Sequence, residues 1–220
     1  MRPGTIDGTP APRTGLDRAT VASEALELLE ERGLEALSIR ALASRLDVSP
    51  MHLYRFFRDK EELLDLVTDA ALGSDLVPPL DPDLDWHTEL AAACRRVWER
   101  FRHQPETARL ILSRPSVTAN GFRAVSGILA ILGKGGIGDD RAIALYQLLR
   151  DFCMSSAVAS SRRDRPSLQR VLDHAPPEAS GLLAAFDRGS IGDPAAQFEI
   201  GLAVLLAGLD QVYGRELQAE

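Results

Sequence analysis

The sequence predicts an all-α protein in two parts, a small N-terminal helical domain followed by a larger C-terminal helical domain. Apolar residues recur every three or four positions through most of the 220 residues, which is the spacing of one helix face. Residue types that begin and end helices stand at the edges of these stretches. The alternation typical of β-strands, a hairpin signal and an internal repeat are all missing from the sequence. These observations favour packed helices over a sheet.

The first two helices are marked by their capping residues. Asp17 can accept hydrogen bonds at the start of the first helix, and Gly33 can end it. Ser38 can cap the second helix in the same way as Asp17. A short break at Asp47-Val48 follows, so we expect a tight turn there before the next helix.

A third and a fourth helix are expected within the next few residues. Ser49-Pro50 is a strong start signal, because a capping hydroxyl precedes a proline whose missing N–H leaves nothing unsatisfied at the first helical position. The third helix is expected to include Tyr54 and Phe57. The fourth begins at Asp59, which together with Glu62 resembles a capping box.

The remainder of the chain predicts a larger helical part. The stretch from Val77 to Asp85 holds three prolines and is expected to form a linker or a long turn. Residues 162–193 are rich in proline, glycine and charge, so we expect at most two short helical pieces there. Longer helices are expected at 86–101, 105–113, 122–132, 139–161 and 194–213.

The charge balance is acidic, with 25 Lys and Arg against 32 Asp and Glu, a net charge of −7 and a pI near 5.2. On that number alone nucleic acid is an unpromising partner, because phosphates attract clustered positive charge. However, residues 1–60 hold nine basic and nine acidic residues, and 38–60 hold five basic and two acidic ones. The acidic excess therefore describes the rest of the chain, and a basic stripe at one end is sufficient for DNA binding.

Three short helices with a tight turn between the second and third are typical of a helix-turn-helix unit. The third helix of such a unit presents its N-terminal residues to base edges in the major groove. Here the candidates are Pro50, Met51, His52 and Arg55. The Tyr54 hydroxyl can reach a phosphate, Arg40 stands at the start of the second helix, and Lys60 opens the fourth, where the helix dipole also favours a phosphate. An ordinary solvated face is the alternative for these cations, because any small three-helix bundle gives this pattern.

The stretch from Leu16 to Val67 carries a specific resemblance to a known family. The matching motifs are Gly33, Leu37-Ser38-x-Arg40-x-Leu42-Ala43, Val48-Ser49, Leu53-Tyr54-x-x-Phe57 and Lys60-Glu61-x-Leu63-Leu64. At these positions the chain resembles the DNA-binding domain of the TetR family of transcriptional regulators. The later segment is similar, more loosely, to the C-terminal domain of the tetracycline-repressor subgroup. The matches there are Arg114-Pro115, the Gly133–Gly138 break and the Phe198–Leu209 helix.

The resemblance implies which residues contact DNA. They are Ser38, Arg40, Pro50, Met51, His52, Tyr54, Arg55 and Lys60. Asp47 stands where the family often has a glycine, and aspartate tolerates the left-handed backbone that the turn requires. Met51 can pack on a thymine methyl group and His52 can donate to a guanine acceptor, so the operator sequence is particular to this chain.

The helix pattern and the resemblance together divide the chain. Residues 1–15, where prolines and glycines are dense, are expected to form a disordered arm. Residues 16–62 form the helix-turn-helix DNA-binding domain in this interpretation, and residues 63–220 form a ligand-binding and dimerisation domain. A connecting helix at 63–76 opens the second domain.

The resemblance implies a repressor that binds a palindromic operator as a homodimer and is released by a small-molecule effector. The dimerisation candidates are the helices near 139–161 and 194–213, because they are long and the last one is almost continuously apolar from Ile200 to Leu209. Burial of this run within one chain is the alternative. The alternative function is a helical small-molecule-binding protein, or a regulator that responds to a protein partner and has no inducer.

Family members typically enclose a small-molecule pocket in the C-terminal domain. The pocket candidates are large or polar residues on the expected inner helices, although plain core is the simpler explanation for each. They are Trp98, Phe101, His103, Phe122, Tyr146, Phe152 and Met154. The subgroup's tetracycline–Mg²⁺ site relies on placed polar and histidine groups, whereas the segment Lys60 to Leu76 contains no histidine. We therefore expect an apolar or amphipathic ligand.

Nothing in the sequence supports an enzyme, a metal site or a cofactor. The glycines between Gly133 and Gly138 match a dinucleotide-binding pattern, but a helix precedes them where that motif needs a strand, so a helix connector is expected. His87 and His103 fall on opposite faces of one helix, which argues against a shared metal. Cys94 and Cys153 are expected to be reduced core thiols.

The sequence gives no sign of a membrane partner. The longest apolar run has ten residues, whereas a helix needs about 20 to span a bilayer. Prolines and glycines occupy the N-terminal positions where a signal peptide carries its apolar core. A cytoplasmic location is therefore expected.

Overall fold

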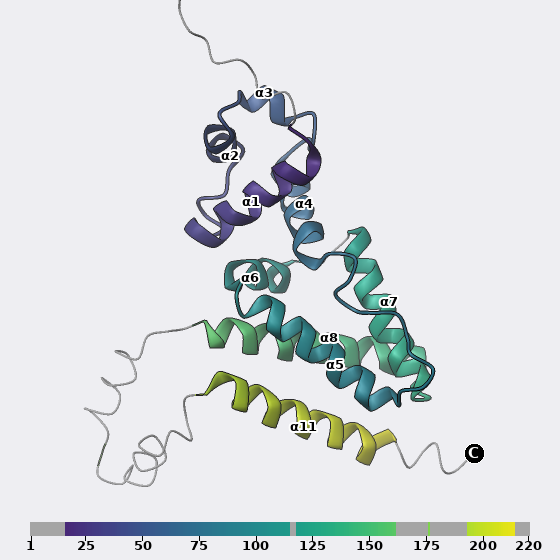
Figure 1. Cartoon of the computed structure of the whole chain (residues 1–220). Helices are drawn as coiled ribbons and strands as arrows, with labels where there is room; N and C mark the ends of the chain where they lie inside the picture. The colour runs from purple at the N-terminus through teal and green to yellow at the C-terminus, as the bar shows by residue number, and fades with distance from the viewer. Residues whose placement is uncertain (1–15, 115–117, 162–175, 177–192, 214–220) are drawn as a thin grey trace, which may run out of the picture.

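The computed structural model describes residues 16–114, 118–161, 176 and 193–213, and within these ranges the chain is helical with no strand (Figure 1). The helices are α1 (Arg18–Arg32), α2 (Ile39–Leu46), α3 (Pro50–Leu53), α4 (Lys60–Leu72), α5 (Trp86–Phe101), α6 (Pro105–Ser113), α7 (Ala119–Lys134), α8 (Asp139–Ser160) and α11 (Pro194–Tyr213). The all-α prediction is confirmed. The arm expected at 1–15, and nearly all of the segment 162–193, lie outside the described residues.

Residues 16–67, which we call the head, close an apolar core of their own. Val21, Leu42, Leu53 and Leu63 come from four different helices and are all fully buried in it. Leu110 of α6 joins this cluster from the remainder of the chain. We call residues 68–213 the body, and Figure 1 shows the head stacked at one end of it.

Each helix of the head is capped at its start by the side chain that the sequence predicts. Asp17 and Asp59 each accept a hydrogen bond from the backbone N–H three residues later, at 2.7 and 2.9 Å. The hydroxyls of Ser38 and Ser49 do the same at 3.2 and 3.3 Å. These bonds satisfy N–H groups that have no partner inside the helix, so short helices can begin at fixed places.

The third helix is shorter than predicted. It ends at Leu53, so Tyr54 and Phe57 lie beyond it. The Phe56 N–H donates to the Leu53 carbonyl oxygen at 2.9 Å, which is the tight turn of a 3₁₀ helix. Because the chain must reverse before Asp59 caps α4, no room remains for another helical turn.

Two helices end at a residue whose backbone φ angle is positive. Asp47 ends α2 with φ 55° and ψ 47°, so the predicted tolerance of aspartate at this turn is confirmed. Gly73 ends α4 with φ 62°, and a Cβ built there would lie 2.9 Å from Arg100 Nη1. The helix therefore runs from Lys60, the start that the Asp59 cap predicts, to Leu72, so it ends four residues before the end of the connecting helix expected at 63–76.

The body is a bundle in which α5 packs against α8, with α6 and α7 also on α8 (Figure 1). Phe101, Leu132, Phe198 and Leu202 are buried between these helices. α7 begins at Ala119, earlier than expected from the apolar pattern, because Thr118 caps it through a 3.1 Å bond from Gly121 N–H. α11 lies at the outer edge of the bundle, on α8 and α5.

A carboxylate from the head caps a helix of the body. Glu30 of α1 accepts from the backbone N–H groups of Glu106 and Thr107 at 3.2 and 2.7 Å, and from the Thr107 hydroxyl at 2.6 Å. Gln104, which precedes α6, makes no capping bond with its side chain. Glu30 therefore serves as the cap of α6 from 76 residues away in the sequence.

Two further polar contacts join α4 to the body. Asp69 accepts from the Asn120 backbone N–H at 2.8 Å, at the start of α7. Arg114 Nη2 lies 3.0 Å from carboxylate oxygens of both Glu61 and Asp65. The head and the body are thus connected by polar bonds as well as by the continuous helix α4.

α11 is long and apolar enough, by length and composition, to cross a membrane, and it is the one such helix among the described residues. Only 17% of the apolar segment is buried within the chain. A single helix of this kind is a weak sign of a membrane span, because a helix at a protein interface passes the same test. The uncovered apolar surface of α11 is nevertheless a feature to explain.

Candidate nucleic-acid interface and ligand cavity

α3, which carries several of the predicted DNA-contacting residues, lies at the end of the head farthest from α11 (Figure 1). Met51 is 76% exposed and Tyr54 is 47% exposed, although both side chains are large and partly apolar. Pro50, Arg55 and Lys60 are also exposed. No internal packing accounts for these side chains, because the head core is complete without them.

His52 and Arg55 form a pair on this surface. Arg55 Nη1 lies 3.1 Å from His52 Nε2. A guanidinium group can only donate, so His52 Nε2 accepts and the ring proton resides on Nδ1. Arg55 also lies over the Phe56 ring, 5.5 Å from its centroid. The contact leaves His52 Nδ1–H and the other guanidinium N–H groups for an external acceptor.

Two of the five basic residues in 38–60 are engaged within the head. Arg45 contacts Glu24, Glu27 and Glu31 of α1 at 2.8, 2.8 and 2.7 Å. The Arg45 hydrogen bond holds the pKa of Glu31 below its usual range. Arg58 is paired with Glu62, which in turn has a lowered pKa for the same reason.

The other three cations have no carboxylate partner among the described residues. They are Arg40, Arg55 and Lys60, which come from α2, the turn after α3 and the first residue of α4. Arg40 and Lys60 are exposed at the starts of their helices, where N–H groups and the helix dipole also favour an anion. Ser38 is half-buried and its hydroxyl caps α2, so it orders the segment that presents Arg40.

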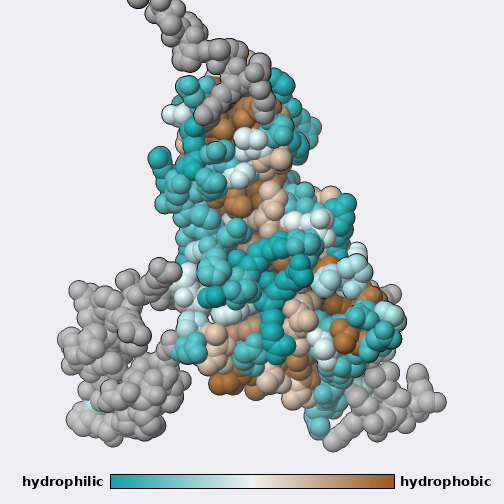
Figure 2. Space-filling model, viewed as in Figure 1, coloured by the Kyte–Doolittle hydropathy of each residue, from teal (hydrophilic) through white to brown (hydrophobic). Residues whose placement is uncertain are grey.

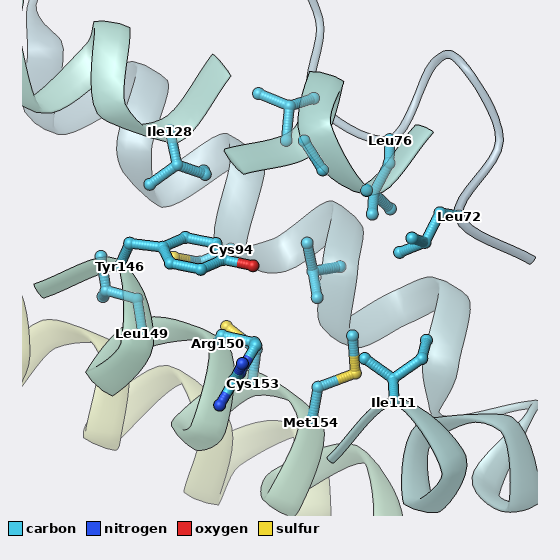
Figure 3. Close-up of a pocket in the computed structure, with 14 residues that line it drawn as sticks. Leu72, Leu76, Cys94, Ile111, Ile128, Tyr146, Leu149, Arg150, Cys153 and Met154 are labelled. Carbon is cyan, nitrogen blue, oxygen red and sulfur yellow. The ribbon is translucent and has the colours of Figure 1, made fainter. Parts of the chain in front are cut away.

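The body contains an apolar cavity of about 50 Å³, partly open to solvent, between α4, α5, α6, α7 and α8 (Figure 3). Roughly three or four water molecules would occupy this volume, since one water needs about 10–15 Å³ on this measure. Fourteen residues line it. They are Leu72, Leu76, Val77, Cys94, Val97, Ile111, Gly121, Ala124, Ile128, Tyr146, Leu149, Arg150, Cys153 and Met154.

The polar groups of this cavity gather on α8. The Tyr146 hydroxyl points into the cavity in Figure 3, and burial raises the pKa of this phenol while the nearby Arg150 partly opposes the rise. Hydrogen bonding with the Cys94 thiol, together with burial, raises the pKa of Cys153 well above its ordinary value. Both cysteines are buried free thiols, as predicted, and Cys153 stays neutral at physiological pH.

A second apolar surface is open to solvent between α8 and α11. It is a groove of about 250 Å³. Its lining residues are Leu145, Leu148, Leu149, Val204, Leu205, Gly208, Leu209, Val212 and Tyr213. Apolar side chains reach the surface along the lower edge of the body, where α11 lies (Figure 2).

Two family models match the chain and together cover both parts of it. The model for bacterial regulatory proteins of the tetR family matches residues 21–67, and the model for the tetracyclin repressor-like C-terminal domain matches residues 78–213. The chain belongs to the TetR family. It is therefore a DNA-binding transcriptional regulator of the helix-turn-helix type and not an enzyme.

Relatives of this TetR-family chain are repressors. The class A tetracycline repressor protein of transposon 1721 from Escherichia coli is 32% identical, over 89% of this chain and 91% of that protein. The HTH-type transcriptional repressor DrrR1 of Streptomyces coeruleorubidus is 26% identical, over 91% of this chain and 79% of that protein. Apo ActR from Streptomyces coelicolor has a similar structure, with a TM-score of 0.79 and 28% identity over 94% of this chain and 100% of that one.

ActR has also been solved with a small molecule. Its complex with actinorhodin matches this TetR-family chain with a TM-score of 0.75 and 28% identity, over 89% of this chain and 96% of that chain. The likeness therefore extends through the part of the fold that contains the cavity.

Two of the seven predicted ligand residues of this TetR-family chain, Tyr146 and Met154, line the cavity. The Trp98 and Phe152 rings both stack on Phe198 instead, with centroids 4.8 and 5.4 Å away. Phe101 is fully buried in the core of the body.

The remaining two predicted ligand residues are on the surface. His103 is paired with Glu99 at 3.6 Å, with 63% of its side chain exposed. Phe122 is 60% exposed on α7. The ligand site that we propose below is therefore narrower than the sequence prediction.

Arg150 was missing from the sequence prediction of the ligand site. It lies four residues after Tyr146 and four before Met154, which is the spacing of one helix face. That spacing was the available signal. A grouping of three or more His, Cys, Asp or Glu residues that could hold a metal ion is not found among the described residues.

Proposed function

We propose that this chain is a repressor that binds a two-fold related operator as a homodimer, in the cytoplasm, and that a small molecule in the body releases it. The observation that carries the DNA role is the sorting of the five cations in residues 38–60 of the head. Arg45 and Arg58 are neutralised by glutamates, whereas Arg40, Arg55 and Lys60 face solvent together with Met51 at one end. A protein that needed its surface charge only for solubility would gain nothing from this separation.

The roles on DNA follow from chemistry. Arg40 and Lys60 are suited to phosphates, which position the head, and α3 is suited to bases, which give sequence preference. Met51 offers an apolar surface to a thymine methyl group. The His52 Nδ1–H can donate to a guanine N7 or O6, while Arg55 holds the ring in place.

The homodimer is supported by the two apolar faces of α11. Phe198, Leu202 and Leu209 point into the body and are buried. Ile200 and Val204, on the other side of the helix, are each 66% exposed. A helix that is apolar on both sides is stable when both sides are covered, and a second copy brings the matching face of its own α8 and α11.

Release by a ligand is supported by the walls of the cavity. Leu72 and Leu76 belong to the end of α4 and the residues after it, and Ile111 belongs to α6. A ligand larger than the present 50 Å³ must push these walls apart. α4 carries Lys60 at its other end, so its displacement moves the DNA-binding surface. The ligand then favours the displaced state, and ligand and operator oppose each other reciprocally.

A mobility-shift experiment tests the DNA role. The parent protein is expected to shift an operator fragment from its own genome, and Arg55→Ala with Lys60→Ala is expected to weaken binding about 100-fold, at roughly 1–3 kcal/mol per contact. Arg102→Ala is the matched control, because Arg102 is a surface arginine of the body paired with Glu99. Equal binding by the double variant and the control would exclude the proposed DNA surface.

A thermal-shift screen separates the induced repressor from a regulator with no inducer. The proposal expects at least one hydrophobic or amphipathic compound to raise the melting temperature and to release DNA at the same concentration. A compound library with no stabilising member would favour the regulator that responds to a protein partner instead.

A further inference from the structure

The cavity has one charged lining residue, Arg150, and no acidic one. Of the fourteen residues that line it, Tyr146 and Arg150 supply the hydroxyl and the guanidinium, and the rest are apolar residues and two cysteines. Positions 146 and 150 are one helical turn apart on α8, so both side chains face the same side of the cavity. Figure 3 shows them opposite Leu72 and Ile111.

The ion pair that Arg150 makes in this structure is weak. The Arg150 Nε and Nη2 donate to the same oxygen of Asp151, at 2.9 and 2.7 Å. The side chains of Asp151 and Arg150 are 53% and 29% exposed, and an ion pair with such access to solvent stabilises little. The Asp151 pair thus engages Arg150 from the solvent side and leaves the cavity side without a carboxylate.

A cation at the edge of an apolar cavity attracts an anion more strongly than one on an open surface does. The lower polarity of the site reduces screening, so the same pair of charges interacts more strongly there. The nearest lining groups do not oppose an anion, because Cys153 stays protonated and Tyr146 presents a neutral hydroxyl that can donate. A carboxylate or a sulfonate can accept from the Arg150 guanidinium and the Tyr146 hydroxyl together.

We infer that the effector is an organic acid: an apolar molecule with one anionic group, bound by Arg150 and Tyr146. This inference rests on the proposed function of the cavity as the effector site and adds the chemical class of the ligand. The acid lies at α8, and the apolar part points toward Leu72, Leu76 and Ile111. This orientation directs the bulk of the ligand against α4 and α6.

Two fluorescent probes with one scaffold test the inference. 1-Anilinonaphthalene-8-sulfonate carries a sulfonate, and N-phenyl-1-naphthylamine is the same aromatic molecule without it. Both are titrated into the full chain. Arg150→Gln is expected to weaken the sulfonate probe about tenfold and to leave the neutral probe within about twofold, because one charge-assisted contact is removed.

Two further variants check the assignment to the guanidinium charge. Arg150→Lys keeps the charge and is expected to keep the affinity of the sulfonate probe within about threefold of the parent. Asp151→Asn removes the competing carboxylate and is expected to tighten the sulfonate probe about twofold. Equal losses for both probes in Arg150→Gln, or no loss for either, would overturn the inference.

Ala124→Phe separates failure of the inference from failure of the proposed function. This change fills the cavity from α7 and is expected to abolish binding of both probes while the chain stays folded. If neither probe binds the parent, or if Ala124→Phe changes neither affinity, the cavity is not a ligand site and the proposed release by a ligand fails too. If Ala124→Phe blocks both probes and Arg150→Gln affects them equally, the cavity binds ligands and only their acidic class is wrong.

Discussion

The head and the body leave different kinds of side chain open to solvent. The head buries its apolar residues around Leu42 and Leu53, and its segment 38–60 exposes three cations that have no carboxylate partner in the described structure. In the body, by contrast, Arg95, Arg100 and Arg102 are paired with acids. What the body leaves uncovered is apolar, in the groove of α8 and α11.

The difference shows what each part still has to bind. An unpaired cation is best satisfied by phosphate, and an apolar groove is best covered by another apolar surface. The head thus closes its own apolar core, but its exposed cations still lack an anionic partner. The body leaves an apolar face of α11 uncovered, which the proposed second copy would bury.

The largest expected effect is the loss of dimerisation through the body, with the fold of the head unchanged. Val204→Glu places a carboxylate in the proposed dimer contact of each subunit, so burial of these charges is expected to weaken dimerisation about 100-fold or more. Sedimentation is expected to show a monomer, and circular dichroism is expected to show the helix content of the parent. Operator binding should fall in parallel, because a monomer contacts one half-site only.

Phe122→Glu is the control for this change. Phe122 is 60% exposed, close to the 66% of Val204, but it is on α7 and outside the groove. It is expected to leave the dimer unchanged. Dissociation by Phe122→Glu, or a stable dimer of Val204→Glu, would place the interface elsewhere.

An intermediate effect concerns the internal charge cluster of the head. Arg45→Met keeps the apolar stem but leaves Glu24, Glu27 and Glu31 to repel one another. The melting temperature is expected to fall by a few degrees at pH 7. Arg58→Met is the control with a smaller expected fall, because the Arg58 side chain is 85% exposed.

This intermediate effect depends on pH in a defined direction. Since Arg45 lowers the pKa of Glu31 in the folded state, the stabilisation is complete above about 4.5, the ordinary value for glutamate, and is lost as the pH falls below it. Parent and Arg45→Met are therefore expected to converge in melting temperature toward pH 3. A difference that stays constant down to that pH would show that the charges contribute nothing.

The smallest expected effect is at the turn before α3. Asp47→Gly removes the strain of a left-handed backbone and is expected to stabilise the chain by about 0.5 kcal/mol, the balance of the left-handed cost and the larger entropy of glycine in the unfolded chain. Asp47→Ala is the matched opposite, with an expected loss of about 1 kcal/mol. Both are measured by chemical denaturation. If the two variants change the free energy of unfolding in the same direction, backbone strain at Asp47 does not determine the stability of this turn.

The helix starts of the head could be predicted from the sequence because each depends on residues three positions apart. Asp17, Ser38, Ser49 and Asp59 cap the helices that follow them regardless of the rest of the chain. The early end of α3 could not be predicted in the same way, because it depends on where α4 has to begin in space.

The cavity and the pairing of charges depend on residues far apart in the sequence. The local count of basic residues included Arg45, and only the packing of α2 on α1 shows that it is occupied by glutamates. Likewise, Trp98 and Phe152 have the size of pocket residues but meet Phe198 from α11 instead. Arg150 was detectable in principle from its helical spacing to Tyr146, but the pattern alone does not distinguish the cavity side of α8 from the groove side.

The Glu30 carboxylate at the start of α6 determines how firmly the head is oriented. α6 also carries Ile111 in the cavity wall, so the head is attached to that wall at three places. They are the continuous backbone of α4, the hydrogen bonds from Glu30, and the ion pairs of Arg114, directly after α6, with Glu61 and Asp65. A domain attached at one point can rotate about that point, whereas a domain attached at several points keeps a fixed orientation. In the proposed dimer, these attachments would define the angle between the two heads even when no DNA is bound.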